Sequence, residues 1–163
     1  MKPIVILGCL VLACGGGSSA PPPDTADDAA AGKSAPGTPA VSTAAPQTFA
    51  EQVALGQKLY GEKCASCHGD SGEGKTAPKV VGLDQGALPL APPPGAQYRK
   101  TEFKTVADVA EFVVKNMPPK EPGSLTEEEY YAILAFDLKA NGIDLGDKKL
   151  DAALAPTLEI PRK

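Results

Sequence analysis

The chain has 163 residues, a formal net charge of −4, 17 prolines, 17 glycines and no tryptophan. This length allows one domain of ordinary size, and aromatic residues at 5% leave only a thin core of large side chains. The acidic balance argues against a nucleic acid as partner, because nucleic-acid binding needs a basic surface.

Residues 1–13 have the pattern of an export signal. The apolar run from Ile4 to Ala13 is too short to span a bilayer as a helix. It ends in Val-Leu-Ala-Cys, which resembles the lipobox of bacterial lipoproteins and implies cleavage before Cys14 and acylation of that residue. Cys9 is a second candidate with a shorter apolar run, and an ordinary cleaved signal is the alternative. We therefore expect export to the periplasm and, with acyl chains on Cys14, a stable membrane anchor.

Residues 14–47 carry the lipidated Cys and then a low-complexity segment of Gly, Pro, Ala, Ser and Thr. The segment has no hydrophobic periodicity and few large apolar groups, so it cannot build a core. We interpret it as a disordered tether, either a leash that lets the domain reach its partners or a plain spacer.

The folded domain is expected over residues 48–144 and begins with a helix. Its apolar stripe recurs at steps of three and four residues up to Cys64, through Phe49, Val53, Gly56, Leu59, Tyr60 and Lys63. Glycine in a helix interior lowers helix propensity. On such a face it usually allows another backbone to come close, so Gly56 predicts a second helix crossing here.

The helix leads into Cys64-Ala-Ser-Cys67-His68, the C-x-x-C-H signature of c-type haem attachment. Each thiol can add to one vinyl group of a porphyrin, and the histidine then serves as the proximal iron ligand. A zinc site does not fit this motif, because the number and the spacing of the candidate ligand residues do not suit zinc. A redox dithiol would need a βαβ context, and a disulfide across this short loop would leave His68 unexplained.

The choice of residue for the sixth ligand of the haem iron is narrowed by elimination. His68 is the only histidine, so two histidine ligands from one chain are impossible. Methionine occurs only as Met1, in the signal, and as Met117, so a sulfur ligand can only be Met117. A lysine, an asparagine or water remains an alternative.

Downstream, Pro78 has a carbonyl that can accept the second N–H of His68, the contact that usually fixes a proximal histidine. Residues 84–100 are rich in proline and are expected to form an irregular surface wrap. A helix should start at Thr105 and end at about Asn116, because two prolines follow Met117.

A last helix should start at a capping box formed by Thr126 and Glu129 and stop at Asn141-Gly142. We expect Ile133 and Phe136 of this helix to cross the first one at Gly56 and Tyr60. Residues 145–163 form an irregular C-terminal tail, expected to drape over the surface or to be mobile.

From about Phe49 to Gly142 the chain resembles the class I cytochromes c. The resemblance rests on Gly56-x-x-x-Tyr60-x-x-x-Cys64-Ala-Ser-Cys67-His68, Ala77-Pro78, the Asn116-Met117-Pro118-Pro119 loop and the last helix. It implies an all-α cytochrome c fold, with three to five short helices around one covalent haem c and crossing N- and C-terminal helices. It further implies thioethers at Cys64 and Cys67, axial ligation by His68 and Met117, and a contact from Pro78 to His68.

The function expected from the resemblance is single-electron transfer between redox protein partners, by a monomer held at a membrane in the periplasm, and not enzymatic catalysis. One alternative is a haem subunit of a larger oxidase or dehydrogenase complex. Another is an open-site haem enzyme or sensor for peroxide, NO or CO, which requires that Met117 is not a stable ligand.

Overall fold

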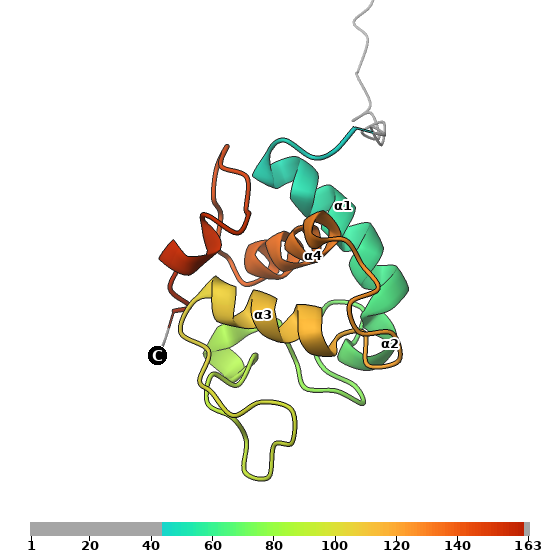
Figure 1. The fold of residues 1–163 in the computed structure, drawn as a ribbon, viewed down its shortest axis with the longest axis vertical. Coiled ribbons are helices and arrows are strands. Elements are labelled where there is room, and N and C mark those ends of the chain that lie inside the picture. Colours follow the sequence, from blue (N-terminus) through green and yellow to red (C-terminus); the bar gives the residue numbers. More distant parts are fainter. Residues whose placement is uncertain (1–43, 162–163) are drawn as a thin grey trace, which may run out of the picture. The chain divides into compact units, whose positions relative to one another are not determined.

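The computed structural model describes residues 44–161, so the expected signal, Cys9, Cys14 and most of the tether lie outside the described residues. The elements are α1 (Phe49–Lys63), α2 (Ala65–His68), η1 (Leu83–Gln85), α3 (Val106–Asn116), α4 (Glu127–Ala140) and η2 (Ala155–Thr157). Within the described range there is no strand, only an isolated bridge between Thr105 and Glu159. The expectation of a helical fold built from short helices is confirmed (Figure 1).

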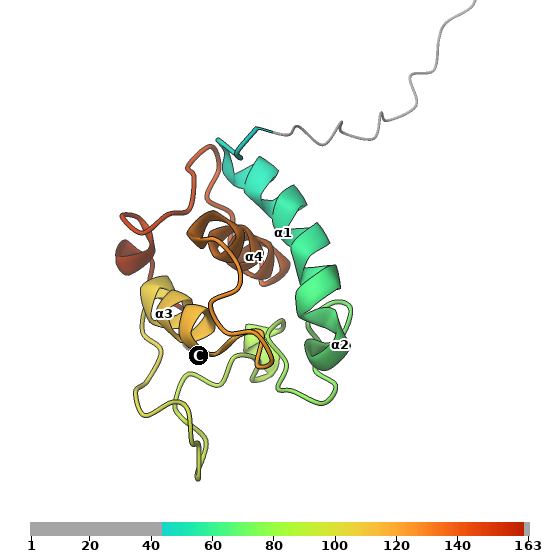
Figure 2. The same ribbon diagram turned by 45° about the vertical axis from the view of Figure 1, so that its right-hand side comes forward.

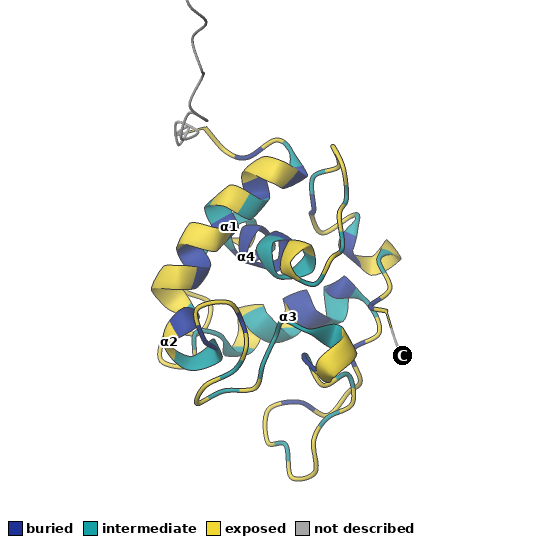
Figure 3. Ribbon diagram, turned by 180° about the vertical axis from the view of Figure 1, so that it is seen from behind, coloured by how far each residue is buried: buried dark blue, intermediate teal, exposed yellow. Residues whose placement is uncertain are grey.

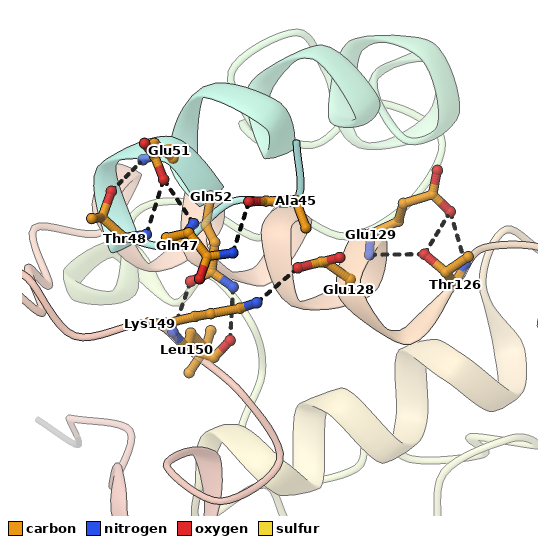
Figure 4. A network of polar contacts seen from close by, with 10 residues as sticks. All are labelled: Ala45, Gln47, Thr48, Glu51, Gln52, Thr126, Glu128, Glu129, Lys149 and Leu150. Atoms are coloured by element: carbon orange, nitrogen blue, oxygen red, sulfur yellow. Dashed lines mark hydrogen bonds and ion pairs between the residues drawn. The ribbon is translucent and has the colours of Figure 1, made fainter. Parts of the chain in front are cut away.

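Each of the three longer helices begins at a threonine followed three residues later by an acidic residue. Thr48 accepts from the backbone N–H of Glu51, while the Glu51 carboxylate accepts from the backbone N–H of Thr48 (Figure 4). The same reciprocal pair opens α4, at Thr126 and Glu129. These capping boxes satisfy donors that the first helical turn leaves free, so local sequence fixes where the helices start.

The main packing contact is the crossing of α1 and α4, which both views show side by side (Figures 1 and 2). A Cβ on Gly56 would lie 1.9 Å from the carbonyl oxygen of Ala132, so only glycine permits this approach. The rings of Tyr60 and Phe136 meet with centroids 5.1 Å apart. The predicted crossing is present, and its closest contact at Gly56 is the backbone of Ala132 rather than the side chain of Ile133.

The C-terminal tail is integrated into the core. Leu150 and Ala155 are fully buried, and Ile160 is buried against α3 and α4. The buried Gln52 amide of α1 donates to the Leu150 carbonyl and accepts from its N–H, both at 2.7 Å (Figure 4). The expectation of a draped or mobile tail is therefore wrong for the described part, because long-range contacts with no local signature hold it.

Burial is concentrated where α1, α3 and α4 face one another, and the outer face of α1 is exposed (Figure 3). The loop over residues 86–104 is mostly exposed, yet it holds three buried residues, Ala87, Arg99 and Phe103. None of the helices in the described range is both long and apolar enough to cross a membrane.

Candidate haem site

The C-x-x-C-H motif forms a single helical turn. Cys64 closes α1 and opens α2, and its carbonyl accepts from the N–H groups of Cys67 and His68 at 3.1 and 3.0 Å. Residues three and four apart on a helix share one face. The turn therefore directs both thiols and the imidazole to the same side, as a covalently held porphyrin with a proximal ligand requires.

The loop after the motif folds back to orient His68. The Nδ1 atom of His68 lies 2.7 Å from the Pro78 carbonyl oxygen. The carbonyl of Cys67 accepts from Thr76 and Ala77 at 3.0 Å, which keeps this loop against the motif. With Nδ1 as the donor to Pro78, Nε2 is the ring nitrogen left with a lone pair for a metal.

Tyr60 supports the same turn from α1. Its hydroxyl donates to the carbonyl of Gly69, directly after His68, at 3.1 Å. Burial, followed by the charges of Asp137 and other acids, raises the pKa of the Tyr60 hydroxyl. Tyr60 therefore stays a neutral hydrogen-bond donor while its ring packs on Phe136.

Met117 is the C-cap of α3 and is held at both backbone ends. Its N–H donates to Val113 in the last turn of α3 at 2.8 Å, and its carbonyl accepts from the Tyr130 hydroxyl at 2.7 Å. The same hydroxyl accepts from the N–H of Gly123 at 3.1 Å. Tyr130 thus joins both sides of the Met-Pro loop, which starts with a cis peptide bond between Met117 and Pro118.

The Met-Pro loop lies within electrostatic range of the attachment motif. The positive charge of Lys120, three residues after Met117, acts on the Cys67 thiol. Together with hydrogen bonds from Thr76 and Ser66, which are the larger causes, it lowers the pKa of that thiol. The loop that carries the half-buried Met117 is thereby electrostatically coupled to the turn that carries His68.

The two thiols lie in different environments. Burial, together with the negative charges of Asp137 and Cys67, raises the pKa of the Cys64 thiol to about 12. Cys64 packs at the edge of the cluster formed by Leu59, Tyr60, Ala65, Ala132 and Ile133. Both cysteines are half-buried, but the Cys64 thiol lies against apolar side chains and the Cys67 thiol lies among polar groups.

The side chains present fit a c-type haem. Two thiols, an imidazole and a thioether are the donors that such a group uses. Arg99 supplies a further observation, because it is 8% exposed and its Nη1 has no hydrogen-bond partner. Its Nη2 donates to the carbonyls of Pro89 and Ala91, and its guanidinium carbon lies 4.0 Å from the centre of the Phe103 ring. A buried cationic donor of this kind suits a carboxylate, and haem carries two propionates.

Comparison with known proteins agrees with this geometry. Residues 51–136 match the family model described as cytochrome c oxidase, cbb3-type, subunit III. The chain belongs to this family. The matched segment contains the C-x-x-C-H motif, Met117 and most of α4, so the domain is a c-type cytochrome and binds haem c.

Two further similarities are to proteins described as dehydrogenases. It is 30% identical over 90 residues to thiosulfate dehydrogenase of Stutzerimonas stutzeri, covering 52% of this chain and 26% of that protein. It resembles the crystal structure of the sulfane dehydrogenase SoxCD from Paracoccus pantotrophus with a TM-score of 0.51 and 28% identity, covering 73% of this chain and 61% of that one. The cytochrome spans about a quarter of the first relative and less than two thirds of the second.

Three residues of this cytochrome domain have roles that sequence reasoning missed. No role was expected for the hydroxyl of Tyr130, which donates to the Met117 carbonyl. Asn141, expected as a helix stop, also accepts from the N–H groups of Gly82 and Leu83 and donates to Val80. Asp137 interrupts the apolar face of α4, and that interruption was a signal available in the sequence.

Proposed function

We propose that this cytochrome transfers single electrons between redox protein partners, using one haem c bound to Cys64 and Cys67 with His68 and Met117 as axial ligands. The observation that carries the proposal is the helical turn that presents both thiols with His68, whose Nδ1 is held by Pro78 at 2.7 Å. When bound, the haem supplies an iron that cycles between the ferric and ferrous states. The chain is not itself expected to transform a substrate.

Each ligand residue has a defined role. His68, fixed by Pro78, presents Nε2 in one orientation. Met117 supplies a soft thioether, which favours the reduced state and raises the potential. With His68 and Met117 both bound to it, the haem iron would have no open position for a small ligand. A partner then needs only a small, transient contact surface, as is typical of weak redox encounters.

The test is the visible spectrum of the oxidised holoprotein, combined with CO titration after reduction. We expect a weak far-red sulfur-to-iron band and no CO binding. Met117→Ala should remove the band, lower the potential and open the iron to CO, whereas Val114→Ala, an exposed position on α3, should change neither. A wild-type protein that contains haem, lacks the band and binds CO would instead support the open-site enzyme or sensor.

A second candidate is a haem subunit of a larger dehydrogenase complex. The similarity to thiosulfate dehydrogenase and to sulfane dehydrogenase SoxCD favours it over an isolated shuttle that acts as a monomer. The measurement is native purification from the source organism under mild conditions. Recovery in a stable assembly that reduces the haem with a sulfur compound would establish the subunit role, and recovery as a free monomer would reject it.

We also propose a periplasmic location with a lipid anchor on Cys14. The support is the apolar run that ends at Val-Leu-Ala-Cys. Cys14→Ser should move the haem protein from the membrane to the soluble fraction, and Cys9→Ser, the matched control within the same segment, should leave it in the membrane. Membrane retention of the Cys14 variant would reject lipidation there.

A further inference from the structure

Asp137 is the one charged residue that lines an apolar cavity between the loop after Pro78, α3, α4 and the tail. The other lining residues come from the loop after Pro78, from α3, from α4 and from the tail, and all are uncharged: Val80, Leu83, Leu88, Val106, Val109, Leu134, Leu138, Asn141, Ile143 and Ile160. The Oδ1 atom of Asp137 is enclosed and has no hydrogen-bond partner, although the residue as a whole is only half-buried. The carboxyl group therefore faces an apolar interior while part of the residue stays open to solvent.

The neighbouring polar groups do not neutralise it. The Asn141 side chain is occupied, because its Oδ1 accepts from Gly82 and Leu83 and its Nδ2 donates to the backbone carbonyls of Val80 and Asp137. The Tyr60 hydroxyl donates to Gly69 instead.

Two titratable groups are coupled electrostatically to Asp137. They are Tyr60, on α1, and Cys64, at its end. The residues that line the cavity from the other elements carry no charge. Covalent attachment of haem turns the Cys64 thiol into a thioether without an ionisable proton, and Tyr60 stays neutral because its pKa is raised. Asp137 is then left as the protein group here that can change charge, and burial raises its pKa to about 8.

The electrostatic effect of the Asp137 carboxyl group on Cys64 links this group to the haem attachment site. The charge of Asp137 acts on Cys64, which holds one edge of the haem, and charges interact more strongly in an apolar interior than in water. An electron added to the haem makes the charge of the haem one unit more negative. A nearby carboxylate is then less favourable, and its protonated form is more favourable.

We propose that Asp137 takes up one proton when the haem held at Cys64 is reduced and releases it on oxidation, so that the domain carries a proton together with its electron near neutral pH. The electron comes from a one-electron donor protein and the proton from water. On reoxidation the electron passes to an acceptor protein and the carboxylate re-forms. This inference rests on the proposed function.

The test is the midpoint potential of the full-length holoprotein, measured by spectroelectrochemistry from about pH 5 to about pH 9. We expect the wild-type potential to fall with rising pH, by at most about 59 mV for each tenfold fall in proton concentration. Asp137→Asn should flatten this dependence. Asp147→Asn, an exposed acid in the tail, should retain it. If the Asn variant does not fold, Asp137→Leu provides the same test with an apolar side chain.

A second readout identifies the proton acceptor directly. Redox-induced infrared difference spectra of the wild type should gain a protonated-carboxyl C=O band on reduction, and Asp137→Asn should lack it. The far-red sulfur-to-iron band, recorded at each pH, excludes ligand exchange as the source of the slope. A flat wild-type potential in a protein with its haem spectrum intact, or an unchanged slope in the Asn and Leu variants, would overturn this inference alone. Absence of haem would overturn the proposed function and this inference together.

Discussion

The helix crossing and the loops that carry the expected haem ligands are built on different principles. At the crossing, Gly56 meets the backbone of Ala132, and the buried Gln52 amide satisfies both backbone groups of Leu150. Among the described residues, the two buried side-chain atoms without partners are elsewhere: Asp137 Oδ1 faces the apolar cavity, and Arg99 Nη1 belongs to the proline-rich loop.

The difference indicates which part of the domain the chain completes by itself. Buried polar groups without partners are costly in a finished structure. The polar groups buried at the crossing have partners within the chain. The expected ligand residues are held by one contact each from another segment: His68 by Pro78 of the loop that follows it, and Met117 by Tyr130 of α4. We infer that the scaffold determines stability, and that the loops determine the properties of the haem.

Gly56→Ala should have the largest effect on the scaffold. The added Cβ would lie 1.9 Å from the Ala132 carbonyl oxygen, so α1 and α4 must separate. We expect a loss of about 3 kcal/mol or more in the free energy of unfolding, measured by denaturant titration of the holoprotein. Gly61→Ala is the control, because a Cβ there meets no atom within 4 Å. Equal effects of the two changes would mean that close approach at Gly56 does not matter.

Gln52→Leu should come next. The buried N–H and carbonyl of Leu150 would lose their partners, which should cost roughly 2 kcal/mol. Hydrogen exchange of the Leu150 amide should accelerate, because the tail is released from α1. Gln57→Leu, at an exposed position of the same helix, should leave stability within about 0.5 kcal/mol. Unchanged exchange at Leu150 in the Gln52 variant would show that the tail is held by other contacts.

Tyr130→Phe should have the smallest effect on stability and a specific one on the loop. It removes the hydroxyl that donates to Met117 and accepts from Gly123, at a cost of about 1 kcal/mol. If this free energy is lost only from the closed Met-Pro loop, conformations in which the loop is open become about fivefold more populated. Cyanide binding to the oxidised haem should then accelerate by the same factor. Tyr131→Phe, on the neighbouring half-buried tyrosine, is the control, and equal rates in both variants would remove Tyr130 from the support of Met117.

Much of the helical layout could be predicted from local sequence. Capping boxes use residues three apart, so Thr48, Thr105 and Thr126 mark the starts of α1, α3 and α4 without any tertiary information. The stop before Met117 follows from the prolines after it. The close approach at Gly56 was predictable because a glycine on the apolar face of a helix usually marks contact with another backbone.

Three features could not be predicted in this way: the packing of the tail, the burial of Arg99 and the hydrogen bonds of the Tyr130 hydroxyl to the Met-Pro loop. Leu150 is 98 positions from Gln52, and no pattern within the tail announces the pairing. Residues 84–100 were expected as a surface wrap, but Arg99 folds inward onto Phe103. Hydrogen bonds between segments that are distant in the sequence depend on which segments the tertiary fold brings together.

The sequence by itself determined the chemistry: two thiols and a histidine in one helical turn, a single methionine in the domain, and the helix boundaries, since all of these depend on residues within a few positions of one another. Only the tertiary structure decided which groups hold that chemistry in place. The backbone of Ala132, the hydroxyl of Tyr130 and the carboxyl of Asp137 acquire their roles from the packing of α4 against distant segments. That packing depends on burial and steric fit, which local sequence patterns do not encode.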